Sequence, residues 1–288
     1  MEVVDYRPQG TTAFDFPFEP IKIRPLGDIQ TGADSCDLDL LQQDVDEAIA
    51  EGAYFIGMGD YIDVASPSNR KIWAASGVYD SMRDFMDDRV LQEQNMLMDI
   101  LRPTKGKWLG MVTGHHWWQY QDGTTTDTNL CRELETVHLG SCGLVNLYFK
   151  DDNKHSIRCT IYVHHGVGSG KGAAAPITKL EEVVGWAEAD IYLMGHQHKL
   201  ANAKKPRFYQ TEGRNPVLVA HNLKLMGTGS YLQGYMQDSK RGGVAVGTYV
   251  EQAQMTPVAL GSPLITVTPK RVTRKGKDMT DLIVKALA

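Results

Sequence analysis

The fold is constrained most by short apolar runs in the sequence, each of which ends within one residue of an acidic or histidine residue. Each run has the length and the apolar content of a buried β-strand. Because the carboxyl ends of parallel strands meet at one edge of a sheet, polar residues placed there are expected to converge. The runs cover residues 21–28, 53–60, 107–114, 156–166 and 191–196.

Segments with helical periodicity separate these runs. Asp37 is placed to cap a helix that continues to Ile49. Further helices are expected over 81–101, from Thr126 or Asp127 to Glu135, and over 177–187.

Two neighbouring runs have a different relationship. Residues 144–150 and 156–166 are expected to form an antiparallel pair around a turn at 151–154, and 216–223 to form another strand. Alternating strands and helices predict an α/β layered fold, and the antiparallel pair predicts more than one sheet.

The last part of the chain changes character after about residue 230. Short strand-like runs at 242–250 and 263–269 are separated by glycine-containing segments. We expect residues 1–230 to form the core and residues 231–288 to supply late strands or an appendage that completes the same domain.

Composition is that of an ordinary globular protein, with 288 residues, 42% hydrophobic and 23% charged. The formal net charge of -5 gives no sign of bulk binding to nucleic acid, and the basic run at 270–277 is typical of solvated surface. No apolar stretch approaches the ~20 residues that cross a bilayer, and the N-terminus lacks the pattern of a signal peptide. The four cysteines show no CxxC spacing, so we expect a cytoplasmic protein without a membrane partner.

The residues at the ends of the runs have the chemistry of a metal site. They are Asp28, Asp60 in GDYID (59–63), His115 and His116 in GHHW (114–117), His164 and His165 before Gly166, and His196 and His198 in GHQH (195–198). One such residue alone is usually a cap or a polar loop residue, but the series at successive strand ends indicates a shared site. Two divalent cations about 4 Å apart can clamp a phosphoryl group and activate water. Carboxylates and neutral imidazoles suit manganese, iron or zinc better than magnesium or calcium, and Asp60 is the natural bridge.

In this order the motifs resemble those of the calcineurin-like metallophosphoesterases, including members encoded by bacteriophages and bacteria. The matching stretches are Asp28-Ile29-Gln30, GDYID, GHHW, the HHG at 164–166 and GHQH, which together span 28–198. The resemblance implies a four-layer α/β/β/α sandwich with mixed sheets. It also implies a metal-dependent phosphoric ester hydrolase with two divalent ions, manganese being favoured and zinc, iron or nickel being alternatives.

The resemblance also implies roles for individual residues. One metal would be held by Asp28, Gln30, Asp60 and His198, and the other by Asp60, His115, His165 and His196. His116 matches the histidine that protonates the leaving group while a metal-bound hydroxide attacks phosphorus in line. His165 is preferred to His164 because it directly precedes Gly166, and neighbouring strand residues face opposite ways.

Three positions depart from the family pattern. Gln30 stands where most members have His, and its amide oxygen can still bind a metal. His115 stands where Asn is usual, and imidazole is a strong ligand for zinc or manganese. Trp117 replaces the acid that usually orients the catalytic histidine. Either His116 is then a weaker acid–base group or Asp63 takes over the orienting role, and we favour Asp63.

The expected substrate is a small nucleotide-like or other phosphoester. Trp117 either stacks on a nucleobase or covers the core, and Lys171 in the glycine-rich loop 166–172 either meets a phosphate or stays solvated. A DNA or RNA nuclease is an alternative, disfavoured by the acidic net charge. A non-catalytic binding module with the same fold is another, disfavoured because every substituted position can still coordinate a metal.

Overall fold

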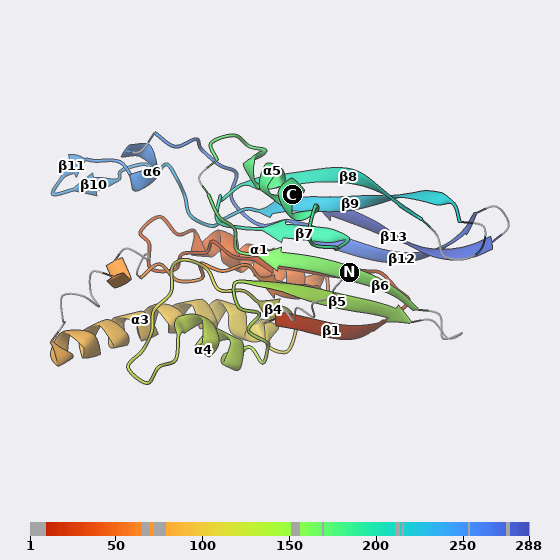
Figure 1. Ribbon diagram of the computed structural model, residues 1–288. Coiled ribbons are helices and arrows are strands. Elements are labelled where there is room, and N and C mark those ends of the chain that lie inside the picture. Colours follow the sequence, from red (N-terminus) through yellow and green to blue (C-terminus); the bar gives the residue numbers. More distant parts are fainter. Residues whose placement is uncertain are drawn as a thin grey trace.

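The computed structural model describes residues 10–64, 69–71, 79–150, 156–168, 170–210, 214, 216–252, 254–274 and 277–287. Two mixed β-sheets pack face to face, and helices cover their outer faces (Figure 1). The predicted four-layer α/β/β/α arrangement with mixed sheets is therefore confirmed.

One sheet has six strands in the order β1-β5-β6-β7-β9-β8. The strands are β1 (Gly10–Pro17), β5 (Cys142–Lys150), β6 (Ser156–His164), β7 (Ile191–Met194), β8 (Leu200–Gln210) and β9 (Leu218–Thr228). β5 and β6 are antiparallel, as predicted, and the predicted turn at 151–154 lies outside the described residues. β6 and β7 are parallel, so both end at the same edge of the sheet (Figure 1).

The other sheet has five strands in the order β13-β12-β2-β3-β4. They are β2 (Ile21–Leu26), β3 (Tyr54–Gly57), β4 (Trp108–Met111), β12 (Leu264–Arg274) and β13 (Lys277–Leu287). β2, β3 and β4 are parallel, and β12 pairs antiparallel with β2. The C-terminal segment thus adds two strands to the sheet that the N-terminal part begins.

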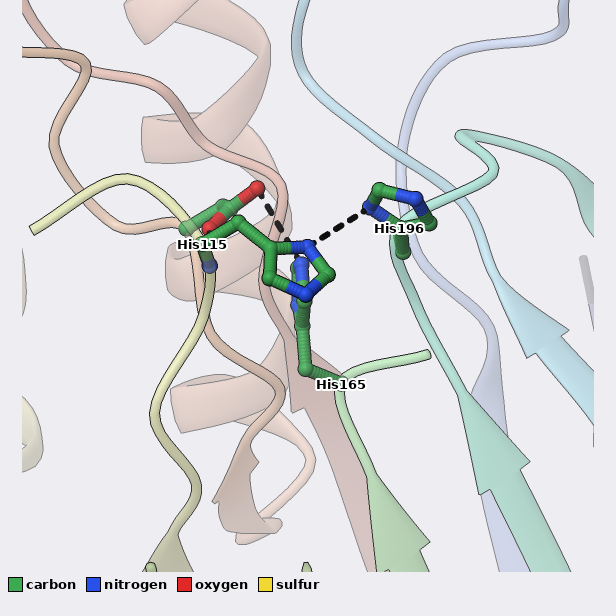
Figure 2. Close-up of side chains that lie close together, drawn as sticks. His115, His165 and His196 are labelled. Carbon is green, nitrogen blue, oxygen red and sulfur yellow. Dashed lines mark hydrogen bonds and ion pairs between the residues drawn. The ribbon is translucent and has the colours of Figure 1, made fainter. Parts of the chain in front are cut away.

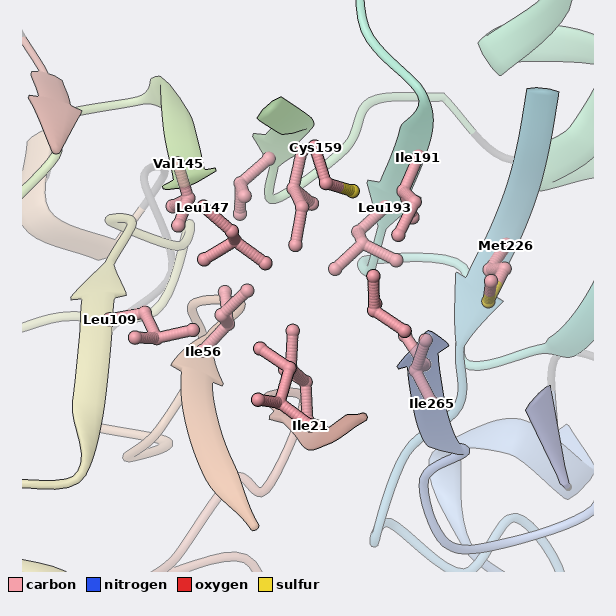
Figure 3. Close-up of a cluster of buried hydrophobic side chains, with 14 of the residues drawn as sticks. Ile21, Ile56, Leu109, Val145, Leu147, Cys159, Ile191, Leu193, Met226 and Ile265 are labelled. Carbon is pink, nitrogen blue, oxygen red and sulfur yellow. The ribbon is translucent and has the colours of Figure 1, made fainter. Parts of the chain in front are cut away.

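The layer between the sheets is an apolar core. Ile56 and Leu109 from the five-stranded sheet face Leu147 and Leu193 from the six-stranded sheet, and all are buried (Figure 3). Successive residues of a strand face opposite ways, so each sheet also presents an apolar outer face. Removing this surface from water is the main favourable contribution to folding.

Helices bury the two outer faces. α1 (Leu38–Ala50), α3 (Asp80–Leu101) and α4 (Thr126–Glu133) pack on the five-stranded sheet, while α5 (Ala175–Val183) packs on the six-stranded sheet. The Asp37 carboxylate accepts the backbone N–H of Leu40 at 2.9 Å and caps α1, as predicted. The cap of α4 is Thr125, one residue before the predicted start, in a reciprocal capping box with Thr128.

Several boundaries differ from those predicted. β2, β3 and β7 stop before the polar residues that were expected to end them, because Asp28, Asp60 and His196 have positive φ angles that no strand accommodates. β4 also ends earlier than predicted, at Met111. The run 242–250 forms only β11 (Val244–Ala245), paired with β10 (Lys240–Arg241), and then the short α6 (Tyr249–Gln252). Strands β1, β8 and β13 were not predicted. Among the described residues, no helix combines the length and the apolar character needed to cross a membrane.

Candidate metal centre

Four of the predicted metal ligands converge. Ligand atoms of Asp60, His115, His165 and His196 all lie within 4.8 Å of one another. His165 Nε2 lies 3.1 Å from Asp60 Oδ2, and the Nδ1 atoms of His115 and His196 are 3.1 Å apart. Figure 2 shows the three imidazoles turned toward one another from separate segments. These segments follow β3, β4, β6 and β7, so both sheets contribute.

The remaining predicted ligands form a second group beside the first. His198 Nε2 lies 3.5 Å from Asp28 Oδ1 and 3.2 Å from the side-chain amide of Gln30. The two groups are tied together by the backbone, since Gln30 N–H donates to the Asp60 carbonyl at 3.0 Å. Asp28 Oδ2 also accepts the His196 N–H at 2.7 Å. All the residues predicted as ligands therefore lie at one edge of the sandwich.

The backbone at these positions is strained in a consistent way. The φ angles are 47° at Asp28, 56° at Gln30, 51° at Asp60, 64° at His196 and 55° at His198. Left-handed conformations cost non-glycine residues about 1–3 kcal/mol each and are found mainly where the surrounding structure imposes them at functional sites. Here the Asp28 carbonyl is held by Ser230, whose hydroxyl donates to it at 2.9 Å.

Two glycines make the close approach of the loops possible. A Cβ on Gly114 would lie 2.1 Å from Asp60 Oδ1. A Cβ on Gly59, which has a φ of +90°, would lie 2.7 Å from His165 Nδ1. Any larger residue would separate Asp60 from its neighbours, which explains the glycine in each motif.

His116 lies beside the cluster without joining it. Its Nδ1 is 2.6 Å from Asp63 Oδ1, and both side chains are partly exposed. The hydrogen bond to Asp63 raises the pKa of His116 above its ordinary value. Asp63 thus occupies the place at His116 that its predicted orienting role requires.

Burial and mutual charge set the protonation of the cluster. Burial raises the pKa of Asp28 to about 6 and, with the positive charges of neighbouring histidines, lowers the pKa of His196 to about 4. Although burial opposes the shifts, the contact between His165 and Asp60 raises the pKa of His165 to about 9 and lowers that of Asp60. Carboxylates and imidazoles buried in contact have the composition of a divalent-cation site.

The donor set fits divalent cations on a direct observation. Asp28 Oδ1 is buried, and within the described part of the chain it accepts no hydrogen bond. A buried carboxylate oxygen that accepts no hydrogen bond, with only the His198 ring nitrogen 3.5 Å away, is costly unless a cation or another donor compensates it. The close approach of ring nitrogens, at 3.1 Å between His115 and His196, likewise suits lone pairs directed at a shared cation.

Other candidate residues lie farther out. Lys171 is exposed on the glycine-rich loop. Trp117 is partly buried, and its ring lies 4.1 Å from the guanidinium carbon of Arg70. His164 turns away from the cluster, where its Nδ1 accepts the Gly166 N–H and its ring stacks parallel to that of Tyr162.

Several polar residues around the site were not predicted from the sequence. Lys199 Nζ donates to the Gly170 and Gly172 carbonyls, the latter at 2.8 Å, and so fastens the glycine-rich loop. Asp127, expected only as a helix start, is 2% exposed behind the GHHW loop, and burial raises its pKa to about 7. Arg70 lies between motifs with no spacing to mark it. A charge one or two positions from a motif is the one sequence signal that could have identified such residues. Of these three residues, only Lys199, directly after GHQH, has it.

Comparisons with known proteins are limited to remote structural similarity. No protein-family model matches the chain, and no curated protein matches it. Vacuolar Protein Sorting 29 from Cryptosporidium parvum is 14% identical, with 94% of this chain and 99% of that chain covered and a TM-score of 0.36. The calcineurin-like phosphoesterase YfkN from Bacillus subtilis is 10% identical, with 94% and 91% covered and a TM-score of 0.34. GAP50, the anchor in the inner membrane complex of Plasmodium, is 12% identical, with 93% and 90% covered and a TM-score of 0.40.

Proposed function

We propose that the protein is a phosphoesterase that depends on two divalent metal ions and hydrolyses a nucleotide-like or other phosphoester. The observation that carries the proposal is the convergence of Asp60, His115, His165 and His196 within 4.8 Å. The second group, at Asp28, Gln30 and His198, adjoins it and supports a second ion. The motif resemblance to calcineurin-like metallophosphoesterases points to the same chemistry.

Asp60 is the residue we assign to both ions. Asp28, Gln30 and His198 would complete one set of ligands, while His115, His165 and His196 would complete the other. Gln30 would bind through its amide oxygen, which a half-turn of the amide directs at His198. Bound divalent cations polarise phosphoryl oxygens and make hydroxide available near neutral pH, and this donor set favours manganese.

His116 is the residue we assign to the leaving group. Asp63 accepts a hydrogen bond from His116 Nδ1, so the proton to be delivered is the one on Nε2. The Asp63 carboxylate would also stabilise the charged imidazolium, so that the proton stays on Nε2 until the leaving oxygen accepts it. Trp117 and Lys171 remain our candidates for contacts with the rest of the substrate.

The proposal is tested with metal-free protein supplied with manganese, zinc, nickel or magnesium. Hydrolysis of bis(p-nitrophenyl) phosphate is compared with hydrolysis of p-nitrophenyl phosphate. We expect activity toward at least one ester, strongest with manganese. Protein that binds metal but cleaves neither ester with any ion would instead favour a non-catalytic binding module.

A further inference from the structure

We infer that Arg70, which lies outside every motif, is a positioning residue that holds the 114–117 loop so that His116 meets the leaving group. The inference rests on the proposed function, because it assigns a role within that reaction. It is carried by the hydrogen bonds that Arg70 makes to the backbone on both sides of His116.

Arg70 bonds to the backbone on both sides of His116. Its Nη1 donates to the His115 carbonyl at 2.9 Å and to the Trp117 carbonyl at 3.0 Å. Its guanidinium also lies over the Trp117 ring, with the carbon 4.1 Å from the ring centroid. A planar cation that stacks on an aromatic ring while bonding two carbonyls is held in one orientation.

A carboxylate holds the N–H groups of the same loop. Asp60 Oδ1 accepts the N–H groups of His115 and His116, the latter at 2.8 Å. The N–H groups of His115 and His116 are therefore held by the Asp60 carboxylate, and the carbonyls of His115 and Trp117 are held by the Arg70 guanidinium.

The charges in this arrangement are complementary. Asp60 and Asp127 are 2% exposed, and both attract the Arg70 guanidinium electrostatically. Arg70 thus supplies a positive charge that interacts with two buried acids. Removing it would leave those acids less compensated and free the two carbonyls that flank His116.

The consequence concerns the direction of the His116 ring. The hydrogen bond to Asp63 sets the rotation of the His116 side chain. The hydrogen bonds from Arg70 to the carbonyls of His115 and Trp117 hold the backbone from which that side chain extends. Without Arg70 the backbone can shift although Asp63 is intact. A displacement of ~1 Å at a reacting group can cost about 10²-fold in rate.

The experiment compares Arg70→Gln and Arg70→Lys in the full chain loaded with manganese. The matched control is Arg102→Gln, an exposed arginine whose partner is Asp99 at 3.6 Å. Two phosphate monoesters are used, dinitrophenyl phosphate with a good leaving group and phenyl phosphate with a poor one. Only the poor leaving group depends strongly on a proton donor.

For Arg70→Gln we expect kcat to fall about 10²-fold on phenyl phosphate and far less on dinitrophenyl phosphate, with KM and metal content nearly unchanged. Arg70→Lys, which keeps the charge but not the fork of donors, should recover part of the loss. Arg102→Gln should behave as the unaltered chain does. Backbone amides of the 114–117 loop should exchange faster with deuterium in Arg70→Gln even without metal.

Other outcomes would overturn the inference. An equal loss on both esters together with lost metal would make Arg70 a support for His115 alone. An equal loss with a raised KM would make it a substrate contact, and unchanged rates with unchanged exchange would leave it no role. Failure of the proposed function is distinct, since the unaltered chain would then cleave neither these monoesters nor bis(p-nitrophenyl) phosphate, while hydrogen exchange would still report whether Arg70 holds the loop.

Discussion

Two histidine–carboxylate pairs lie at opposite ends of the six-stranded sheet, and their surroundings differ. His165 and Asp60 are 3.1 Å apart with side chains 3% and 2% exposed, whereas His221 and Asp190 are 2.9 Å apart with side chains 21% and 23% exposed. In the first pair burial and further histidines surround the contact. In the second, Asp190 also accepts the backbone N–H of Thr160 at 2.7 Å and so joins the start of β7 to β6.

The comparison shows that distance alone does not identify a metal centre. Asp60 and His165 belong to a group of four converging ligand atoms, and Asp60 has a left-handed backbone. Neither His221 nor Asp190 is among the described residues with positive φ, and the pair satisfies its own charges. Burial, additional donors and backbone strain together make the first pair, and not the second, the candidate functional pair.

The largest effect is expected from Asp60→Ala. The proposed bridging ligand is lost, so activity should fall well beyond the about 10–100-fold that follows removal of an outer partner of a metal ligand. Metal content, measured by elemental analysis, should drop at both positions. Asp190→Asn is the matched control from the other pair and should retain full activity and metal. Full activity in Asp60→Ala would refute the bridging role.

Removal of metal should lower the stability of the fold through the end of the sheet that carries His165 and Asp60, and not through the end that carries His221 and Asp190. Manganese at 100 times its dissociation constant should stabilise the fold by about 2.7 kcal/mol per ion, because the unfolded chain lacks the assembled site. Calorimetry should show a melting temperature that rises with added manganese and falls with chelator. The same titration on Asp60→Ala should show little shift, and a melting temperature independent of manganese in the unaltered chain would contradict the metal centre.

A smaller effect is expected from Asp63→Asn. Loss of the carboxylate should lower kcat by about 10–100-fold, the usual consequence of removing the partner that orients a functional histidine. Because Asp63 raises the pKa of His116, its loss should also move the alkaline limb of the rate profile to lower pH. Steady-state rates across pH measure both effects, and an unchanged profile would leave Asp63 without the orienting role.

The smallest effect is expected from His221→Gln, which should alter stability only. Its hydrogen bond with Asp190 raises the pKa of His221 above the ordinary value of 6.5. The folded state therefore holds the proton more tightly, and the stabilisation is fully present below pH 6.5 and is lost as pH rises through the raised pKa. Urea unfolding should give a difference of at most about 1 kcal/mol at acidic pH. A difference that grows toward alkaline pH would show the sign to be wrong.

Much of the fold and of the candidate site could be predicted from the sequence. The apolar runs of β2, β3, β6 and β7 are unambiguous because both faces of each strand are buried. Their polar ends identified residues that the structure brings together, including His165 in preference to His164. The antiparallel pairing of β5 with β6 followed from a short connection between two apolar runs.

The rest depended on contacts that leave no local pattern. β8 carries Lys204, Lys205 and Pro206 and is mostly exposed, so it lacks the alternation of a half-buried strand. The run 242–250 has apolar residues but joins neither of the two large sheets, and glycines with positive φ interrupt it. Arg70 could not be predicted, because its importance depends on which carbonyls it reaches in space.

The left-handed residues around the candidate metal centre imply a conflict between thermal stability and catalysis. Glycine at Gln30 or His198 would fit the backbone better than the residue present, so that change should make the metal-free chain harder to melt. It would also remove a proposed ligand. A laboratory evolution experiment that rewards heat resistance alone should therefore erode these positions first, whereas one that also rewards phosphate ester cleavage should retain them.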